Sequence, residues 1–353
     1  AQMSKEYDLV AANFRWWMVR VLDVVLRPLW TKVFSGVDVR EEDMERIRAA
    51  MRDGTAILVP SHRSHFDYLL LSWVFYNHGL IIPHVVAGAN LAIWPVSIVL
   101  RAAGGFFVKR RFAGERIFPA VFSRYLRELV RHGYPIEFFI EGGRSRSGKL
   151  LIPRLGVLGM VYDSAAMRPD GAEVTVLPMA MAYEQVAEAR AYAREISGEK
   201  KRKETLGEVV RASSVLSHRL CKVYLRVGEP IRVSKDVDPI DGRPTWDDRD
   251  RQDHKETLHR VGERIVHRIG EVTVVTPTSL VALALLAHHR RGIQHEELVA
   301  RIERFRAFLS RTGAEEVSSL SHFSQAINEA LHRLHTNRQV ESFEHHGASV
   351  WAV

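Results

Sequence analysis

The sequence has very little cysteine, and its hydrophobic residues never form a long uninterrupted run. Cys221 is the only cysteine among 353 residues. An intrachain disulfide is therefore excluded, which fits a reducing cytoplasmic setting. No apolar run reaches the roughly 18 residues that a membrane-spanning helix needs. The sequence contains no Gly-x-Ser-x-Gly motif, so it lacks the nucleophile signature of the common serine hydrolases. It also contains no internal repeat.

A histidine and an aspartate stand close together just after an apolar run. Residues 56–60 predict a buried strand, and the segment after Asp67 predicts a helix. Asp67 at the helix start is favoured by the helix dipole, and the intervening loop can fold His62 back toward it. A carboxylate bonded to one imidazole nitrogen raises the basicity of the other. Since no protein nucleophile accompanies the pair, we expect His62 to activate a hydroxyl group of a substrate.

Two simpler interpretations of this segment stay open. Asp67 could cap the helix beside an ordinary surface histidine, and the spacing alone favours that interpretation. His62 and His65 could instead bind a metal ion. We expect no metal, because the sequence offers no obvious third ligand.

Glycines and cations follow a second apolar run. Residues 136–140 predict a short buried strand, and residues 141–149 then hold two adjacent glycines and three cations. The glycines let the backbone approach a ligand closely, and the cations can form charge-assisted hydrogen bonds. This segment therefore predicts an anion site.

A third cluster of cations ends another predicted strand. Residues 106–109 are apolar up to Lys109, and Arg110 and Arg111 follow. Successive strand residues point to opposite faces, so Lys109 and Arg111 share one face and Arg110 occupies the other. Arg110 is the cation that we expect to act alone in an anion pocket. The alternative is a solvated basic turn.

Together with residues 176–178, these segments resemble the four ordered motifs of the glycerolipid acyltransferase family. The segments 62–72, 141–148, 183–186 and 227–230 are similar to its membrane-bound bacterial glycerol-3-phosphate 1-O-acyltransferases almost letter for letter. The similarity runs from about residue 30 to about residue 230 and continues more weakly to the end. Four motifs in order are far more specific than any one of them.

The resemblance implies transfer of an acyl group from a thioester to the 1-hydroxyl of glycerol 3-phosphate, without metal or cofactor. It implies that His62 is the general base and that Asp67 orients it. Alternative acceptors are dihydroxyacetone phosphate and lysophosphatidic acid, and a non-catalytic lipid- or phosphate-binding protein is a further alternative. The intact His62–Asp67 pair favours an enzyme. By resemblance, glycerol 3-phosphate is held by Arg110, Lys109, Glu141, Gly142, Arg144 and Ser145, and the acyl-donor pocket includes Phe107 and Pro178.

The charge balance agrees with these partners. The chain has 50 Lys and Arg against 42 Asp and Glu, and its pI is about 9.7. Such a surplus suits anionic lipid headgroups, acyl-CoA or acyl carrier protein. Nucleic acid is not expected, because no nucleic-acid-binding motif is present and the cations cluster in short loops.

The order of predicted elements indicates an α/β protein with a mixed β-sheet flanked by helices, the glycerolipid acyltransferase fold. We expect a helical, membrane-interface region over 1–53, the catalytic domain over 54–240, and a mainly helical region over 241–353. Members of this subfamily are longer, so we expect the chain to be truncated. Expected strands are 56–59, 83–87, 106–109, 136–140, 174–180 and 223–227, and expected helices are 67–78 and 116–132.

We expect monotopic association with the cytoplasmic face of the inner membrane, because the product that the resemblance implies is an amphiphile, and an amphipathic segment near the N-terminus could provide the contact. Over residues 14–30, Arg20, Asp23 and Arg27 share one arc, and apolar residues occupy the other side. Such a helix can lie in the membrane interface or pack on the domain, and the pattern favours neither. An apolar patch at 91–100 could line the acyl channel or touch lipid. The expected anchors are Trp16, Trp17 and Trp30.

Overall fold

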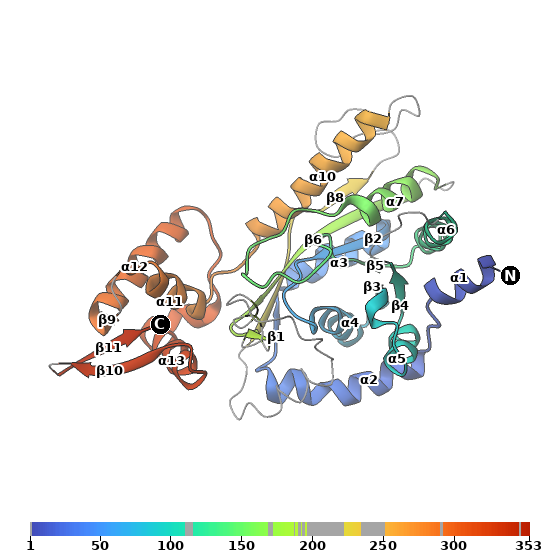
Figure 1. The fold of residues 1–353 in the computed structure, drawn as a ribbon. Helices are drawn as coiled ribbons and strands as arrows, with labels where there is room; N and C mark the ends of the chain where they lie inside the picture. Colours follow the sequence, from blue (N-terminus) through green and yellow to red (C-terminus); the bar gives the residue numbers. More distant parts are fainter. Residues whose placement is uncertain are drawn as a thin grey trace.

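A mixed eight-stranded sheet forms the centre of the computed structural model (Figure 1). The structure describes residues 2–109, 116–168, 172–186, 188–189, 192, 195, 222–233, 251–289, 292–345 and 347–353. The strands are β1 (Val37–Val39), β2 (Gly54–Pro60), β3 (His84–Gly88), β4 (Gly105–Val108), β5 (Ile136–Glu137), β6 (Glu173–Tyr183), β7 (Val223–Val227) and β8 (Ile231–Val233). Their order is β1-β7-β6-β2-β5-β3-β4, and β8 also pairs with β6.

Strands β2 to β6 run parallel, whereas β7 and β8 run antiparallel to β6. Parallel neighbours need crossover connections, which helices provide here. Because both faces of the sheet are covered, β2 and β6 are apolar almost throughout. The helices of this part of the chain are α1 (Gln2–Val10), α2 (Trp16–Pro28), η1 (Leu29–Val33), α3 (Glu41–Asp53), α4 (Asp67–Asn77), η2 (Ala89–Leu91), α5 (Val96–Ala102), α6 (Ile117–Arg131), α7 (Leu155–Ala166) and α10 (Arg251–Glu271).

Two hydrophobic cores hold the helices to the sheet. On one face, α6, α7 and α10 pack on side chains such as Ile57 and Val176. On the other face, α3 and α4 pack on side chains such as Leu58 and Leu177, which point the opposite way because strand residues alternate. Figure 1 shows α2 lying outside α4 on this second face. The sheet is thus the middle layer of an α/β protein, and the predicted fold class is confirmed.

The strand β6 changes partners at Pro178. Its residues 174–176 pair with β8, and residues 179–183 pair with β7. Between them, Leu177 and Pro178 face the corner formed by residues 228–230, and the Pro178 carbonyl accepts a hydrogen bond from Gly228 N–H at 2.8 Å. Proline has no N–H to donate, and it therefore suits a point where the ladder is interrupted. The described contacts give Pro178 a role in sheet topology; its contribution to an acyl-donor pocket stays a prediction.

The C-terminal part forms a separate layer of helices against a small sheet, at the left of Figure 1. Its core is a third hydrophobic cluster that includes Val281, Ile302 and Leu331. The region is mainly helical as expected, but it also contains a three-stranded sheet of order β10-β11-β9. Its elements are α11 (Pro277–Leu286), β9 (Gly292–Gln294), α12 (His295–Arg311), η3 (Ser318–His322), α13 (Phe323–Thr336), β10 (Glu341–His345) and β11 (Ala348–Ala352).

Several elements differ from the sequence-based expectation. The expected strand 136–140 is a strand only over Ile136–Glu137, although Phe138 N–H still donates to the Leu58 carbonyl at 3.1 Å before the chain turns away. The short strands β1 and β8 were not expected, and β1 joins the main sheet from within the segment 1–53. The proposed boundary at residue 240 lies outside the described residues, and so does a run of four cations, Lys-Lys-Arg-Lys, at 200–203. The three-part domain division stays a prediction.

Helix α2 is amphipathic with its apolar side outward. Met18 and Val19 are buried against the body. Asp23 was expected on the polar side of the helix together with Arg20 and Arg27. Its carboxylate is instead buried, where it pairs with Arg27 at 2.6 Å. None of the described helices has the length and hydrophobicity of a bilayer-spanning helix. The large apolar side chains that α2 exposes are Trp16, Trp17, Val21, Val24 and Val25, which are 52%, 59%, 46%, 68% and 63% exposed.

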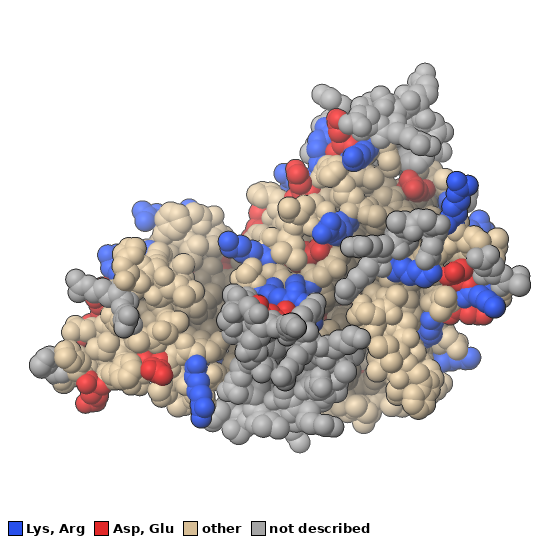
Figure 2. Space-filling view, in the orientation of Figure 1, with Lys and Arg blue, Asp and Glu red and all other residues tan. Residues whose placement is uncertain are grey.

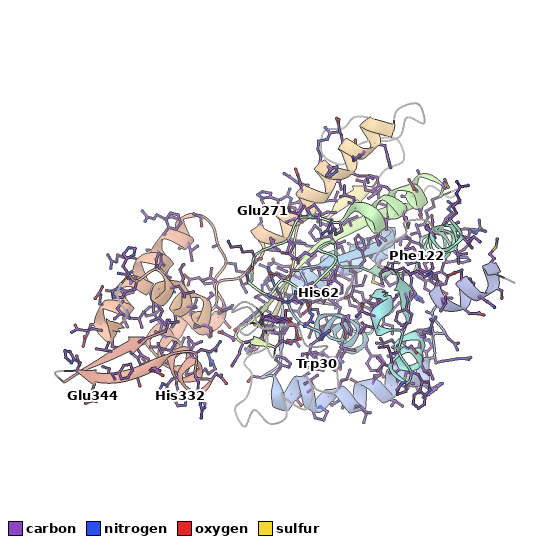
Figure 3. The ribbon with its side chains drawn as sticks, viewed as in Figure 1. Trp30, His62, Phe122, Glu271, His332 and Glu344 are labelled. Atoms are coloured by element: carbon purple, nitrogen blue, oxygen red, sulfur yellow. The ribbon has the colours of Figure 1, made fainter. Side chains whose placement is uncertain are left out.

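Trp30 is not on this surface, and its expected role as a membrane anchor is wrong. Its side chain is completely buried. The π-helical turn η1 follows α2 directly and carries Trp30 into the core, where its ring stacks on Phe34 at 5.5 Å and meets the rings of Phe66 and Trp73. Figure 3 shows Trp30 below α4 and inside the body. Trp30 thus anchors α2 to the protein.

Candidate active site

The site lies where the neighbouring parallel strands β2 and β5 end. His62 stands two residues beyond Pro60, the last residue of β2, and residues 141–145 follow β5. Ser145 N–H donates to the His62 carbonyl at 2.9 Å, which joins the two loops. Figure 3 places His62 near the middle of the α/β body. Loops at the carboxyl ends of parallel strands are the usual place for a ligand in such sheets.

His62 and Asp67 form the predicted pair. His62 Nδ1 lies 2.9 Å from Asp67 Oδ2, and the imidazole stacks on the Phe139 ring with centroids 4.0 Å apart. With Nδ1–H donating to the carboxylate, Nε2 carries the free lone pair. Among the described residues, none bonds to Nε2. The side chain is 14% exposed, so this nitrogen is available to a ligand.

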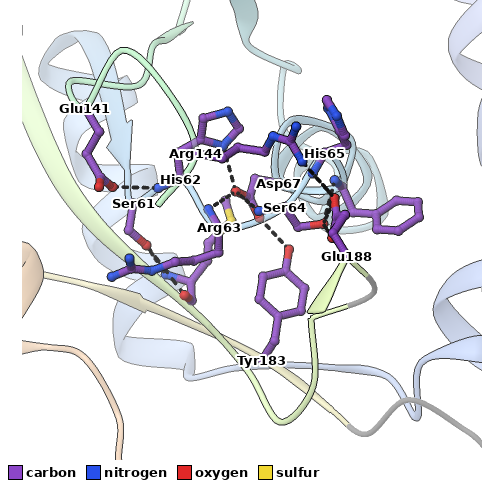
Figure 4. Close-up of polar contacts among 12 residues, drawn as sticks. Ser61, His62, Arg63, Ser64, His65, Asp67, Glu141, Arg144, Tyr183 and Glu188 are labelled. Carbon is purple, nitrogen blue, oxygen red and sulfur yellow. Dashed lines mark hydrogen bonds and ion pairs between the residues drawn. The ribbon is translucent and has the colours of Figure 1, made fainter. Parts of the chain in front are cut away.

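The Asp67 carboxylate is completely buried and accepts four hydrogen bonds (Figure 4). Besides His62, its Oδ2 accepts from the backbone N–H groups of Arg63 at 2.6 Å and Ser64 at 2.9 Å. Its Oδ1 accepts from the Tyr183 hydroxyl at 2.6 Å. Asp67 is also the first residue of α4, where the helix dipole favours negative charge. These interactions stabilise an ionised carboxylate in the position that orients His62. The alternative of a simple helix cap is therefore incomplete, because the same carboxylate also binds the imidazole.

Glu141 fixes the backbone on both sides of the site. Its Oε1 accepts from His62 N–H at 2.8 Å, and its Oε2 accepts from Leu151 N–H at 3.0 Å. The side chain is 3% exposed. The described contacts therefore give Glu141 a positioning role, which differs from the contact with glycerol 3-phosphate that the resemblance implies.

Gly142 permits the turn that follows. Its φ is +64°, in the region where side chains are strained, and an added Cβ would lie 2.8 Å from Arg154 Cγ. Its N–H donates to the Phe139 carbonyl at 3.0 Å. Gly142 therefore shapes the loop that brings Arg144 and Ser145 beside His62.

Arg144 is a partly buried cation beside the pair. Its Nη1 donates to the Tyr192 hydroxyl at 2.7 Å and lies 3.5 Å from the Glu188 carboxylate. The guanidinium also stands over the Tyr192 ring, 5.5 Å from its centroid. Figure 4 shows Arg144 reaching across His62 toward Glu188. Of the described cations that were predicted to hold an anion, Arg144 is the one that lies beside the His62–Asp67 pair.

Glu188 joins a third segment of the chain to the site. It accepts from Ser64 Oγ at 2.9 Å and from His65 N–H at 2.8 Å. Burial raises the pKa of the Glu188 carboxyl, and the hydrogen bonds from His65 and Ser64 oppose that rise. Glu188 therefore holds the loop between β2 and α4 from the side opposite Glu141.

The serine hydroxyls around His62 are committed to structure. Ser61 Oγ accepts from Met181 N–H at 2.9 Å, Ser64 Oγ donates to Glu188, and Ser145 Oγ donates to the Lys149 carbonyl at 2.6 Å. None of these three bonds to the imidazole. Chemically, the site provides a base and a nearby cation, and this arrangement suits activation of a hydroxyl on an anionic substrate.

The remaining predicted residues lie away from His62 or outside the described residues. Lys109 follows β4 at the same edge of the sheet, and its ammonium lies 3.5 Å from Glu6 and 4.4 Å from the centroid of the Phe118 ring. Phe107 is buried in β4 beneath the Arg101 guanidinium. Arg110 lies outside the described residues. The pocket roles of these three residues stay predictions.

Glu137 is a buried acid that sequence reasoning did not single out. It is 0% exposed, and neither carboxylate oxygen has a hydrogen-bond partner among the described residues. Burial, and then the nearby Asp67 charge, raise the pKa of Glu137 well above its usual value. Burial thus disfavours a second negative charge beside Asp67.

Three residues of the site were missed: Tyr183, Glu188 and Tyr192. Tyr183 stands five residues after Pro178, in the segment 183–186 that resembles the family, and this position was the available signal. Glu188 and Tyr192 follow a few residues later without a pattern of their own. Tyr192 also donates from its hydroxyl to the Arg63 carbonyl at 3.0 Å.

Two family models match successive parts of the chain. Residues 38–182 match the family model described as Acyltransferase. Residues 192–353 match the family model described as Glycerol-3-phosphate acyltransferase C-terminal region. A solved structure, the 1-acyl-sn-glycerophosphate acyltransferase of Thermotoga maritima, has a TM-score of 0.39 and 17% identity over 71% of this chain and 79% of that chain. A TM-score this low does not establish a shared fold.

Curated relatives match across both regions. The protein of Pasteurella multocida (strain Pm70) is 37% identical over 314 residues, that of Histophilus somni (strain 129Pt) 36% over 313, and that of Pseudomonas putida (strain GB-1) 36% over 318. All three are named glycerol-3-phosphate acyltransferase. The matches cover 87%, 86% and 88% of this chain but only 38%, 38% and 37% of those proteins. With two successive family models and these relatives, the chain belongs to the glycerol-3-phosphate acyltransferase family.

Proposed function

We propose that the protein transfers a fatty acyl group from an acyl thioester to the 1-hydroxyl of glycerol 3-phosphate, giving 1-acylglycerol 3-phosphate. The observation that carries this proposal is the His62–Asp67 pair, with a 2.9 Å contact at Nδ1 and Nε2 available. A base without a protein nucleophile beside it is what direct transfer to a hydroxyl requires. The relatives' names supply the acceptor.

In this mechanism His62 Nε2 takes the proton of the 1-hydroxyl, and the hydroxyl oxygen attacks the thioester carbonyl carbon. The carbon–sulfur bond then breaks, and the thiolate leaves with the proton from the imidazolium. Asp67 keeps the imidazole in the required tautomer and stabilises its charged form. Arg144 binds the acceptor phosphate, and this contact, remote from the reacting atoms, orients the hydroxyl toward His62.

The function is tested by supplying each acceptor with each donor. The chain, with phospholipid vesicles, is mixed with glycerol 3-phosphate, dihydroxyacetone phosphate or lysophosphatidic acid, and with palmitoyl-CoA or palmitoyl acyl carrier protein. We expect thiol release and 1-acylglycerol 3-phosphate, identified by mass spectrometry, to depend on glycerol 3-phosphate. Faster turnover of another acceptor would establish that acceptor instead. Ligand binding without turnover by any pair would indicate a binding protein.

Binding of the acceptor phosphate should depend on Arg144. Arg144→Ala removes a charge-assisted contact worth about 1.5–3 kcal/mol, so we expect the KM for glycerol 3-phosphate to rise at least about tenfold. The KM for the acyl donor should change much less. Arg110→Ala should behave alike. The matched control is Arg131→Ala, at an exposed position of α6. An unchanged acceptor KM with a raised donor KM would assign these arginines to the donor.

The proposed location is the cytoplasmic face of the inner membrane, with α2 in the lipid interface. The exposed apolar side of α2, flanked by the exposed Arg20 and Arg27, supports this proposal. The neighbouring segment before and within α5, which contacts α2, adds Ile93, Trp94 and Ile98, which are 66%, 77% and 55% exposed. In Figure 2 the part of this surface in view at the lower right carries few charged side chains. Tryptophan and arginine together suit the headgroup level of a bilayer.

Membrane binding is tested by flotation with vesicles of increasing anionic lipid content. Each surface cation adds about 1 kcal/mol of attraction, so the bound fraction should rise with that content. Trp17→Glu combined with Val21→Glu should greatly reduce flotation without unfolding the protein, because both side chains are exposed. The matched control is Leu286→Glu with Phe343→Glu, at exposed positions of the C-terminal region. Equal loss in both double variants would contradict a specific role for α2.

A further inference from the structure

Tyr183 is the one side chain outside the β2–α4 segment that donates to Asp67 among the described residues. It is the last residue of β6, which lies next to β2 in the sheet. Its hydroxyl lies 2.6 Å from Asp67 Oδ1, the oxygen that does not face His62 (Figure 4). The other donors, Arg63 and Ser64, are backbone N–H groups on Oδ2. Tyr183 therefore fixes the rotation of the Asp67 carboxylate about the Cβ–Cγ bond.

The Tyr183 hydroxyl can only act as a neutral donor here. Burial first, and then the Asp67 charge, raise the pKa of Tyr183 well above its usual value. A neutral hydroxyl points the positive end of its dipole at the carboxylate. It therefore holds the carboxylate in the orientation that faces His62.

Other ionisable groups around the pair come from each neighbouring element. Burial raises the pKa of Glu137 on β5, which disfavours a negative charge there beside Asp67. Glu188 and Arg144 form a partial ion pair at 3.5 Å, which leaves their combined field small. Burial also raises the pKa values of two further tyrosines close to these groups. These are Tyr68 of α4 and Tyr192.

The residues after Tyr183 bind the C-terminal region. Glu184 accepts from the Thr278 hydroxyl at 2.8 Å, at the start of α11, and lies 3.8 Å from Arg333 of α13. Gln185 accepts from Asn337 at 3.0 Å, just after α13. Glu184 is 5% exposed. The end of β6 is thus held by the catalytic pair on one side and by two helices of the C-terminal region on the other.

We infer that Tyr183 is a positioning residue for the His62–Asp67 pair, and that the C-terminal region holds Tyr183 in place through Glu184. The inference rests on the proposed function, since it assigns His62 the role of base. It gives the region of residues 277–337 a part in catalysis without any contact with substrate. Because Tyr183 is already held in place before substrate binds, less conformational entropy is lost in ordering the catalytic pair when substrate arrives.

The first test is Tyr183→Phe, assayed with glycerol 3-phosphate and palmitoyl-CoA. We expect kcat to fall about tenfold, the effect of about one hydrogen bond to a charged group. KM for glycerol 3-phosphate should stay within about twofold. The acid limb of kcat/KM should move to higher pH, because a carboxylate with one donor fewer stabilises the imidazolium more. A purely structural role would not move this limb.

The controls separate the inference from the proposed function. Tyr125→Phe removes a tyrosine hydroxyl that accepts from Ala12 N–H, between α6 and the segment after α1, and it should leave kcat and the pH profile unchanged. In a His62→Ala background, Tyr183→Phe should cause no further loss. If His62→Ala is inactive while Tyr183→Phe has the parent kcat and pH profile, the inference fails and the function stands. Full activity of His62→Ala would instead overturn the function.

The second test is a double-mutant cycle between Tyr183→Phe and Thr278→Val. Thr278→Val keeps the shape of the side chain but removes the hydroxyl that binds Glu184. We expect it to lower kcat and to shift the acid limb in the same direction as Tyr183→Phe, by a smaller amount. In the Tyr183→Phe background its effect should vanish, because both changes act through one contact. An unchanged kcat for Thr278→Val, or an equal effect in both backgrounds, would overturn the part assigned to the C-terminal region.

Discussion

His62→Ala is expected to reduce kcat at least about 10²-fold while the protein stays folded. A positioned general base contributes on the order of 10²–10⁴-fold, and His62 is the only imidazole that the structure, over its described residues, pairs with Asp67. The side chain is 14% exposed and packs on Phe139 in the loops beyond the strand ends, outside the hydrophobic core, so its removal should cost little stability. Steady-state rates at saturating glycerol 3-phosphate and palmitoyl-CoA provide the measurement.

The matched control for this prediction is His78→Ala. His78 ends α4, and its Nδ1 bonds the Val74 carbonyl at 2.8 Å, away from the site. It should retain the parent kcat. Thermal unfolding of both variants would show that any difference is chemical. Near-parent turnover by a folded His62→Ala protein would exclude His62 as the base.

Asp67→Asn should be almost as severe, with kcat reduced at least about 10²-fold. The amide has no charge to stabilise the imidazolium, and it can present an N–H to His62 that favours the wrong tautomer. It also keeps a single carbonyl oxygen where the carboxylate accepts four hydrogen bonds. KM for glycerol 3-phosphate should change little, because Asp67 is buried beneath the base.

The control is Asp53→Asn, at an exposed position at the end of α3. It makes the same chemical change without affecting the pair. Rates across pH would add a second criterion. If Asp67→Asn lowered kcat only as much as this control does, Asp67 would serve only to cap α4.

The pair could be predicted because it is local. His62 and Asp67 are five positions apart, and a helix start at Asp67 allows the loop to bring them together. The spacing alone favoured a simple helix cap, and the family resemblance decided for the pair. Tyr183 is 116 positions from Asp67 in the sequence. Its contact depends on β6 lying beside β2, a neighbour relation that the sequence pattern of either strand does not contain. Tertiary pairing therefore decides which polar residues complete the site.

Glu141 illustrates a different limit. A carboxylate among cations predicts an anion site, yet its oxygens bind the backbone of two loops. Only the close approach of the β2 and β5 loops creates those N–H partners. Similarly, the amphipathic pattern of α2 predicted its apolar surface, but the π-helical turn that buries Trp30 has no sequence signal that we could identify.

The fold class followed from alternating apolar strands and amphipathic helices, and the long strands were found near their observed positions. The short β1 and β8 were missed, because three residues are too few to show a period. Helix α7 was missed for another reason. Its sequence is apolar nearly all round, since it packs against both α6 and α10, and such a segment has little helical periodicity.

Pro178 changes how the fourth family motif is interpreted. A motif shared by enzymes of one chemistry is commonly assumed to touch the substrate. Here the described contacts of the proline concern a strand that exchanges one neighbour for another at that residue. Substitution of Pro178 could therefore abolish activity by misaligning the β6 residues that follow, including Tyr183. Loss of activity in such a variant would be evidence about the architecture of the sheet, and it would not identify an acyl-donor contact.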